Sequence, residues 1–381
     1  MNTLAFVRFE VDEVVVPARA DVILPLAASV EVGMPWDRAP ILLVKGTTAD
    51  GIVAYGEADR GVSRAQVDRT LTALLNRDLR SFHPASGWDA TPAPPLPGMF
   101  AASPLSHATP WEQSLVETLW LDAMGKAAGL PAWSLLGGKF RKRVRVDAWA
   151  NRPPAKTLAR LVEQAVAAGY KGMKLKCSAR GDTLHAVAEI ADSVPPEFEF
   201  TIDPMCAWRS FHESSNLFRL AARLPFGVRI EDPFSHATPA EWHRAKQAVP
   251  IPLIWHARGL DLLRYALREQ LADAYNVAGQ PAFRFLAAAG MLAGASAHCW
   301  HGASLELGIQ QMARLHACAA APACEMASDL SSHWVREHTL VLETPCVQEG
   351  TLEVPDRPGL GVTLDPDAVA RFRLASWSVE S

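Results

Sequence analysis

The chain has 381 residues, 49% hydrophobic and 20% charged, which is long enough for two or three domains and apolar enough for a large core. A formal net charge of -4 argues against nucleic acid as a partner, and no apolar run is long enough to predict a membrane helix. The N-terminus lacks a basic region followed by an apolar stretch, and the six cysteines form no CxxC pair. We therefore expect a cytoplasmic protein with reduced thiols.

The first third of the chain predicts a unit of strands and helices. Residues 4–16 and 40–56 are rich in Val, Ile and Leu and are interrupted by turns, which is typical of antiparallel strands. Between them, residues 28–36 form an apolar loop where a strand meander needs only a tight turn. The apolar spacing becomes helical from residue 111 to residue 128.

After residue 144, short apolar segments alternate with helical ones. The strand candidates are residues 144–148, 172–176, 198–203, 228–231, 251–256, 274–277 and 295–299. Helical stretches separate several of them, and this alternation predicts parallel strands joined by crossover helices. About eight such units close into a barrel more readily than they extend an open sheet. Turns and strands return after residue 345, and we expect this tail to pack on the first domain.

Polar residues end most of the predicted strands, and in a parallel barrel these ends form the active face. They are Lys174, Lys176, Asp203, Glu231, His256 and His298. The two lysines are two positions apart and so share one side of their strand. In one confined site each ammonium would depress the pKa of the other, which would make one lysine a base near neutral pH. The alternative, and the commoner arrangement, is a lysine that extends into solvent.

Asp203 and Glu231 end neighbouring predicted strands, one strand–helix unit apart. Carboxylates in that relation suit a hard cation such as Mg²⁺, which prefers oxygen ligands. For either carboxylate alone, a helix cap or a salt bridge would be the better interpretation. Two of them, with the lysines one unit earlier, favour a metal-binding site.

The sequence resembles the mandelate racemase and muconate lactonizing branch of the enolase superfamily along nearly its whole length. The motifs that carry the resemblance are GIVAYGEA at 51–58, ETLWLD at 117–122, GKA at 125–127, LLGG at 135–138, KLK at 174–176 and PDRPGLGV at 355–362. Asp203 with Trp208, and Glu231 followed by Asp232 and Pro233, fall in the family's order and spacing.

This resemblance implies an α/β fold, a modified TIM barrel of (β/α)7β type with an α+β capping domain. The expected divisions are a capping domain at residues 1–130, a barrel at residues 131–345, and a C-terminal segment at residues 346–381 that packs back on the capping domain. Members of the family assemble as dimers or octamers, so a homo-oligomer that acts on a small-molecule carboxylate is implied.

The resemblance also implies a chemistry, the metal-dependent abstraction of the proton next to a carboxylate. Lys176 would be the base, Lys174 would polarise the substrate carboxylate, and Asp203 and Glu231 would bind Mg²⁺. The metal and the lysines would supply positive charge to a negative intermediate.

Three positions depart from the family pattern. His256 stands where one branch has its third acidic metal ligand, and as a ligand it would favour Mn²⁺ or another transition metal over Mg²⁺. Met205 replaces the Asn that usually follows the metal aspartate by two positions. The sixth predicted strand, at 275–280, ends without the strong acid or base found in the family.

Further positions are implied in the substrate site. His298 resembles the seventh-strand histidine of acid-sugar dehydratases, although it lacks an aspartate partner, and a role in the core is equally compatible with the sequence. Glu325, or alternatively Asp329, occupies the eighth-strand acidic position. In the loop that sets specificity in the family, Met34 and Trp36 suggest an apolar wall, which fits a highly hydroxylated sugar poorly and keeps a more apolar acid open as the substrate.

We therefore expect a hydroxy-acid or acid-sugar dehydratase, a lyase that uses Lys176 as its only base. The alternative of another class is a non-catalytic barrel that binds a small carboxylate. A racemase or cycloisomerase is a third reading, and racemisation is disfavoured because the second base is missing.

Overall fold

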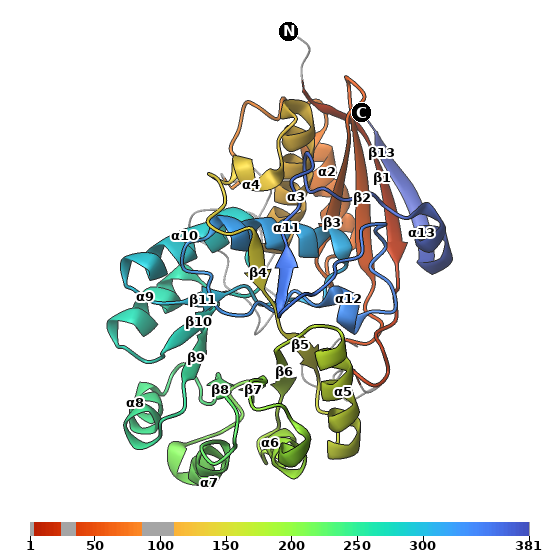
Figure 1. Ribbon diagram of the computed structural model, residues 1–381. Helices are drawn as coiled ribbons and strands as arrows, with labels where there is room; N and C mark the ends of the chain where they lie inside the picture. The colour runs from red at the N-terminus through yellow and green to blue at the C-terminus, as the bar shows by residue number, and fades with distance from the viewer. Residues whose placement is uncertain (1–3, 24–35, 86–109, 381) are drawn as a thin grey trace.

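The computed structural model describes residues 4–23, 36–85 and 110–380 of the chain. Within these ranges the strands form a four-stranded sheet of order β13-β1-β2-β3, a seven-stranded sheet of order β11-β10-β9-β8-β7-β6-β5, and a pair of β12 with β4. Figure 1 shows the four-stranded sheet with helices α2 and α3 at one end of the molecule, and the seven-stranded sheet curled below it.

The four-stranded sheet is antiparallel and is covered by two helices. Its elements are β1 (Phe6–Val14), β2 (Ile41–Thr48), β3 (Val53–Ala58) and β13 (Arg373–Glu380), with α2 (Arg64–Leu74) and α3 (Pro110–Ala128). Ser63 caps α2 in a reciprocal capping box with Gln66, which satisfies two backbone donors at the start of this helix. The strands and the helix expected from residues 4 to 128 are therefore confirmed.

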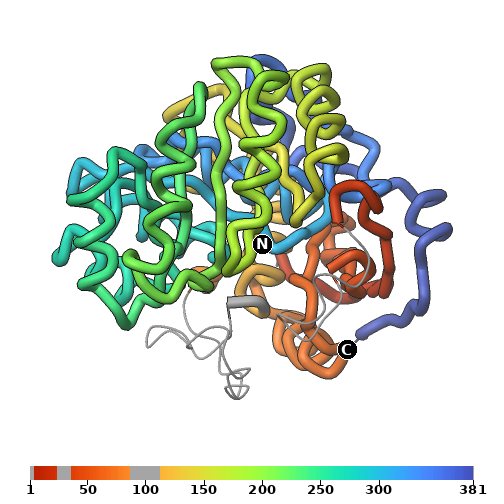
Figure 2. Tube along the Cα trace, turned by 90° about the horizontal axis from the view of Figure 1, so that it is seen from below, coloured from red at the N-terminus to blue at the C-terminus, as the bar shows by residue number. Residues whose placement is uncertain are grey.

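The end of the chain completes this sheet. β13 pairs antiparallel with β1, and Trp377 lies opposite Val11. Figure 2 shows the last segment, in blue, running beside the first strands, in red. The boundaries expected after residues 130 and 345 stay predictions, because one continuous core cluster includes residues from all three expected parts, such as Val14, Phe200 and Val369.

The strands of the seven-stranded sheet are all parallel and alternate with helices that lie on its outer side (Figure 1). The strands are β5 (Ala148–Ala150), β6 (Gly172–Lys176), β7 (Glu199–Asp203), β8 (Val228–Glu231), β9 (Leu253–His256), β10 (Ala274–Asn276) and β11 (Cys299–Trp300). The helices are α5 (Ala155–Ala167), α6 (Asp182–Glu189), η1 (Ala191–Ser193), α7 (Phe211–Ala221), α8 (Pro239–Ala248), α9 (Leu260–Arg268), α10 (Ala282–Gly294) and α11 (Gly308–Ala320).

The remaining elements are short. They are α4 (Ala132–Leu135), β4 (Arg143–Arg145), α12 (Ser332–Val335), β12 (Thr351–Glu353) and α13 (Pro366–Phe372). The crossover arrangement explains the amphipathic spacing of the outer helices, since α5 buries Leu158, Leu161 and Val162 and exposes its other side. The expected TIM-type α/β fold with a capping layer of strands is confirmed.

Residues 323–329 close the barrel between β11 and the chain that leads into β5. On one side the Cys299 amide donates to the Ala323 carbonyl and the Asp329 amide to the His301 carbonyl. On the other side, the Ser328 amide donates to the Arg145 carbonyl at 2.8 Å. This segment therefore takes the place of an eighth strand and brings Asp329 to the same edge as the carboxyl ends of the other strands.

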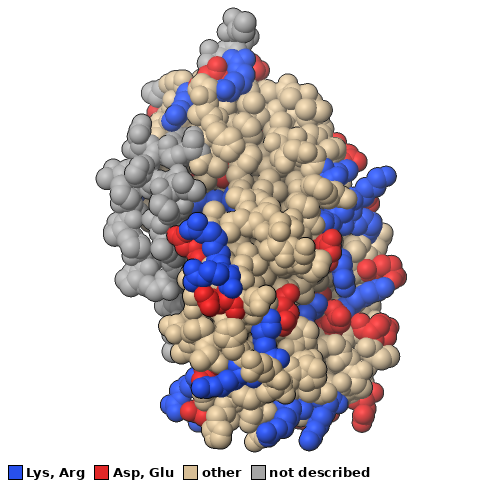
Figure 3. Space-filling view, turned by 90° about the vertical axis from the view of Figure 1, so that its left-hand side faces the viewer, with Lys and Arg blue, Asp and Glu red and all other residues tan. Residues whose placement is uncertain are grey.

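The surface carries charges of both signs. On the face drawn in Figure 3, Lys and Arg side chains are interspersed with Asp and Glu. In the described ranges, none of the helices has the length and apolar character needed to cross a membrane.

Candidate active site

Strand β6 presents its two lysines to the inside of the barrel. Met173 and Leu175 are completely buried in the core, and the alternation of a strand turns Lys174 and Lys176 to the opposite side. In the register with β7, Lys176 lies opposite Asp203. The sequence thus places two ammonium groups beside the carboxylate that ends the neighbouring strand.

Lys174 is enclosed by three carboxylates. Its Nζ lies 2.7 Å from Glu231 Oε2, 2.9 Å from Asp329 Oδ2 and 3.7 Å from Asp203 Oδ2, and its side chain is only 4% exposed. Burial alone would lower the pKa of Lys174, but the three carboxylates outweigh it and raise the pKa above its ordinary value. The expectation that two neighbouring lysines depress each other's pKa is therefore wrong for Lys174.

Lys176 has a more open position. Its Nζ donates to Asp203 Oδ2 at 2.5 Å, and its side chain is 15% exposed. The other oxygen of Asp203 accepts the Met205 amide at 2.9 Å. Burial opposes the charged form of Asp203, but Lys176 and Lys174 hold the pKa of this carboxyl well below its usual range. Asp203 is therefore ionised and shared between the two lysines.

Glu231 joins the ends of three strands. Its Oε1 accepts from Lys174 at 3.0 Å and from the Asn276 amide at 2.8 Å, and it lies 3.7 Å from His256 Nδ1. Burial raises the pKa of Glu231 to about 8, against the lowering effect of Lys174. Five ionisable groups form one cluster, which we call the charged cluster and which is buried except for the partly exposed Lys176: Lys174, Lys176, Asp203, Glu231 and Asp329.

Asp203, Glu231 and His256 offer donors that suit a divalent cation. Burial lowers the pKa of His256 to about 3, so its imidazole is neutral, as metal binding requires. Its Nε2 has no hydrogen-bond partner in the described part of the chain. Two carboxylates and one imidazole fit Mn²⁺, Fe²⁺ or Zn²⁺ better than Mg²⁺, which prefers oxygen ligands. Lys174 contacts both carboxylates, so a bound cation would share them with this ammonium.

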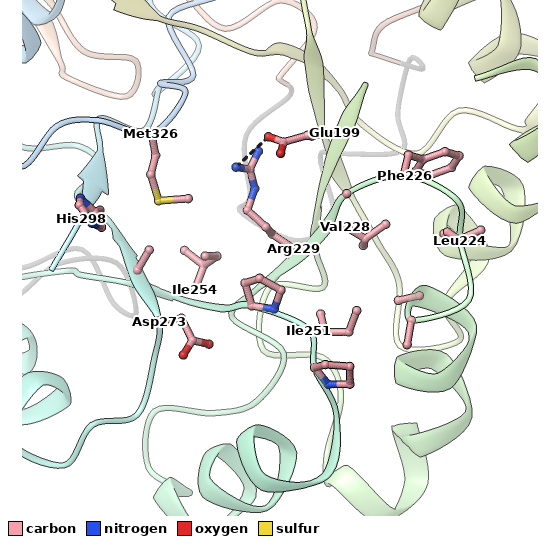
Figure 4. A pocket seen from close by; sticks show the side chains of 16 residues that line it. Glu199, Leu224, Phe226, Val228, Arg229, Ile251, Ile254, Asp273, His298 and Met326 are labelled. Carbon is pink, nitrogen blue, oxygen red and sulfur yellow. Dashed lines mark ion pairs between the residues drawn. The ribbon is translucent and has the colours of Figure 1, made fainter. Parts of the chain in front are cut away.

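The structure places His298 and Glu325 away from this cluster. β11 begins at Cys299, so His298 precedes the strand and lies at its amino end. Its Nδ1 is 3.1 Å from Glu325 Oε2, and both side chains are more than half exposed. Figure 4 shows His298 on the rim of a pocket of about 570 Å³, lined by residues at the amino ends of the strands such as Val228 and Asp273. We therefore do not assign His298 or Glu325 to the active site, and this corrects their expected roles.

The histidine that follows β11, His301, directs its ring nitrogens to backbone carbonyls. His301 is completely buried, and its two ring nitrogens lie 2.9 Å from the Gly302 carbonyl and 3.2 Å from the Gln280 carbonyl. Its ring packs on Phe285 with centroids 4.5 Å apart. These contacts turn the imidazole toward the backbone, and in the described part of the chain the His301 ring has no hydrogen bond to the side chains of the charged cluster.

Of the expected loop residues, Trp36 lies beside the cluster, and Met34 lies outside the described residues. Lys176 Nζ is 5.9 Å from the centre of the Trp36 ring, close enough for a cation–π contact. Trp36 also packs on Trp149 of β5, with ring centroids 6.0 Å apart. Trp36 is buried, and its indole Nε1 has no hydrogen-bond partner among the described residues.

Asp329, the alternative to Glu325 for the eighth-strand acidic position, lies at this edge, 2.9 Å from Lys174 Nζ. A further residue at this edge, which the sequence pattern does not mark, is Asn151. Asn151 directly follows β5, and because Ala150 pairs with Leu175, it lies next to Lys176 along the sheet edge. It is 1% exposed, yet neither polar atom of its amide has a hydrogen-bond partner within the described ranges. Buried amides are normally satisfied, so this one is available to a ligand.

Comparison with known proteins gives the family. Residues 157–368 match the family described as enolase C-terminal domain-like. The chain is 27% identical over 344 residues to muconate cycloisomerase 1-1 of Acinetobacter lwoffii, which covers 87% of this chain and 88% of that protein. It is 28% identical over 387 residues to a "probable glucarate dehydratase" of Streptomyces coelicolor, covering 91% of this chain and 87% of that one.

A search of solved structures finds the same fold in an enzyme of this kind. The crystal structure of muconate lactonizing enzyme from Pseudomonas fluorescens, complexed with muconolactone, superposes with a TM-score of 0.78 at 21% identity, covering 97% of this chain and 100% of that chain. At this identity the likeness concerns the fold alone. The family match, which spans more than half of the chain, shows that this protein belongs to the mandelate racemase and muconate lactonizing branch of the enolase superfamily.

Proposed function

We propose that the protein dehydrates a small hydroxy acid, such as an acid sugar, with Lys176 as its single proton-transfer group. Membership of the superfamily supports chemistry that begins with removal of a proton next to a carboxylate. The observation that carries the proposal is the unequal environment of the two lysines. Three carboxylates surround the Lys174 ammonium and stabilise its charge. Lys176 has one carboxylate partner, and its side chain is partly exposed to solvent.

Members of the superfamily depend on a divalent metal, typically Mg²⁺. In this chain Asp203, Glu231 and His256 would hold the cation, and their mixed donors favour a transition metal. When bound, the cation supplies positive charge that stabilises negative charge developing on the substrate carboxylate.

Lys176 can serve both proton transfers of a dehydration on one face of the substrate. In its neutral form it takes the proton from the carbon next to the carboxylate, and the carbon–oxygen bond at the neighbouring carbon then breaks. The leaving hydroxyl takes that proton back from Lys176 and departs as water, so the lysine ends as it began. Lys174, held as a cation, stabilises the negative charge in between. This sequence predicts that hydrogen and hydroxyl leave from the same face.

The residues at the neighbouring strand ends support a one-base reaction. Asn276 ends β10 with an amide that donates to Glu231 and cannot exchange a proton at neutral pH. His298 lies at the opposite end of β11, and His301 points toward backbone carbonyls. A racemase that works with two opposed bases would need a group that none of these residues supplies.

The unpaired buried groups favour a substrate with hydroxyls. The Asn151 amide offers a donor and an acceptor, and a hydroxyl group can satisfy both. Trp36 adds an indole N–H donor beside Lys176. A purely apolar acid would leave these groups unsatisfied, at a cost of about 1–3 kcal/mol each.

A screen of acid sugars and smaller hydroxy acids in D₂O, with Mg²⁺, Mn²⁺ and Zn²⁺ in turn, tests the proposal. Proton NMR follows exchange at the carbon next to the carboxylate and formation of a 2-keto-3-deoxy acid. Formation of the keto acid supports dehydration. A lactone from a muconate-type diacid would instead identify a cycloisomerase. An acid that binds without exchange and without product would identify a non-catalytic carboxylate-binding barrel.

Asn151 allows a prediction that separates binding from folding. Asn151→Leu is expected to lower kcat/KM by roughly tenfold or more, because a substrate hydroxyl loses its partner. The same variant should be as stable as the wild type, or more stable by about 1 kcal/mol, because it removes a buried amide without partners. Urea unfolding and steady-state kinetics measure the two effects. Asn216→Leu, at an exposed position of α7, is the control, and equal activity in both variants would contradict a role for Asn151.

A further inference from the structure

A second group of potential metal ligands lies in the loops after β7 and β8. Among the residues that the structure describes, Cys206, Asp232 and His236 are the only set of three or more His, Cys, Asp or Glu whose ligand atoms all lie within 4.8 Å of one another. Asp203, Glu231 and His256 are not gathered so closely. The group thus has the compactness of a metal site without belonging to the charged cluster around Lys174.

The distances within the group suit one bound ion. Cys206 Sγ is 3.6 Å from Asp232 Oδ2, and His236 Nε2 is 2.8 Å from Asp232 Oδ1. Ligands of a tetrahedral zinc ion lie about 2.0–2.3 Å from the metal, which puts the ligand atoms roughly 3–4 Å apart. Small side-chain shifts would therefore bring all three to one ion.

Each ligand is held in position by its surroundings. The His236 ring stacks on Trp255 with centroids 3.8 Å apart and planes 13° from parallel. Asp232 Oδ1 accepts the His256 amide at 2.9 Å, and the Cys206 amide donates to the Asp232 carbonyl at 2.7 Å. Side chains fixed in this way lose little freedom when they bind an ion, which favours affinity.

Two features of the site oppose the binding of an ion, and the first of them makes the affinity depend on pH. Burial, reinforced by the charge of Asp232, raises the pKa of the Cys206 thiol, so binding must release its proton. Arg258 lies 3.5 Å from Asp232 Oδ2, but its side chain is 37% exposed and can turn toward solvent. The positive charge of an ion would compensate for the loss of this guanidinium contact.

We propose that Cys206, Asp232 and His236 bind one thiophilic divalent cation, Zn²⁺ by its preference for sulfur, nitrogen and oxygen donors in a tetrahedral site. The Cys206 S–H bond breaks, the thiolate bonds to the ion, and the proton passes to solvent. His236 gives up its Nε2 hydrogen bond to Asp232, moves its ring proton to Nδ1 through solvent, and binds the ion through Nε2. Water takes the fourth position. The ion would link the loop after β7 to the loop after β8, the two loops that follow Asp203 and Glu231.

Titration of the metal-free full-length protein with Co²⁺, as a spectroscopic substitute for Zn²⁺, tests this assignment. We expect one thiolate-bound ion per chain, in addition to any ion held by Asp203, Glu231 and His256. It should give a strong near-ultraviolet thiolate-to-cobalt absorption band and visible bands of tetrahedral intensity, both removed by added Zn²⁺. Cys206→Ser and His236→Gln are each expected to weaken Co²⁺ binding by at least roughly 100-fold and to abolish the thiolate band or the tetrahedral spectrum.

Controls separate this site from the rest of the chain. Cys346→Ala, at an exposed cysteine, should keep the band, and so should Asp203→Asn, which disables the carboxylate site beside Lys176. Circular dichroism confirms that each variant is folded. Absence of the band in the folded wild type, or a band that survives in Cys206→Ser, overturns the assignment. Because the band reports thiolate ligation and not turnover, this outcome is independent of the proposed dehydration.

Discussion

Replacing Lys176 with methionine is expected to lower kcat/KM by about 10²–10⁴-fold, the usual contribution of a general acid–base group. Methionine keeps the length of the side chain but cannot take or return a proton. The same loss should appear in the exchange of the substrate proton with D₂O, because that exchange needs only the first transfer. Both are measured on the substrate that the screen identifies.

Two comparisons make this result specific to proton transfer. Lys156→Met, at an exposed position of α5, should leave the activity unchanged. Lys176→Arg keeps the positive charge beside Asp203 but holds its proton too firmly, so it should be nearly as inactive as Lys176→Met. An arginine variant with close to full activity would show that Lys176 contributes charge alone and would contradict its role as the base.

Replacing Lys174 with methionine is expected to lower the free energy of unfolding by about 3–5 kcal/mol, because it leaves buried carboxylates without their counter-ion. The ammonium contacts Glu231 and Asp329 at less than 3 Å and is almost inaccessible to water. Urea unfolding followed by tryptophan fluorescence measures the change. The buried position excludes the solvent screening that makes surface ion pairs weak.

The matched control for this variant is Lys171→Met, which removes an exposed ion pair with Glu349. It should change the free energy of unfolding by less than about 1 kcal/mol. Adding Glu231→Gln to Lys174→Met removes one of the unpaired charges and should recover part of the lost stability. Equal stability of the Lys171 and Lys174 variants would mean that water or rearrangement satisfies the carboxylates.

The fold could be predicted because its signals are distributed along the chain. The alternation of apolar segments and helical stretches marked the parallel strands, and strand ends with Lys176, Asp203 and Glu231 pointed to one edge. Lys176 contacts Asp203, and Lys174 connects Asp203 to Glu231, so the three residues do belong to one cluster. Such predictions depend on the order of elements and tolerate errors of a few residues at each boundary.

The position of a site residue that depends on the exact first or last residue of one strand is harder to predict from the sequence. The strand expected at residues 295–299 is in fact β11 at Cys299–Trp300, and this shift moves His298 from the carboxyl end to the amino end. In the same way, the apolar pattern predicts the first barrel strand at residues 144–148, whereas β5 is Ala148–Ala150, so the pattern does not mark Asn151 as the residue after a strand. The raised pKa of Lys174 depends on Asp329, which is distant in sequence and reaches it only through closure of the barrel.

The pairing of β13 with β1 has a consequence for how the protein is made. β1 lies between β2 and β13, so one of its edges has no partner until residues 373–380 have left the ribosome. An unpaired strand edge invites pairing with other chains. Translation that stops before residue 373 would therefore release a chain whose first sheet has an open, aggregation-prone edge beside β1.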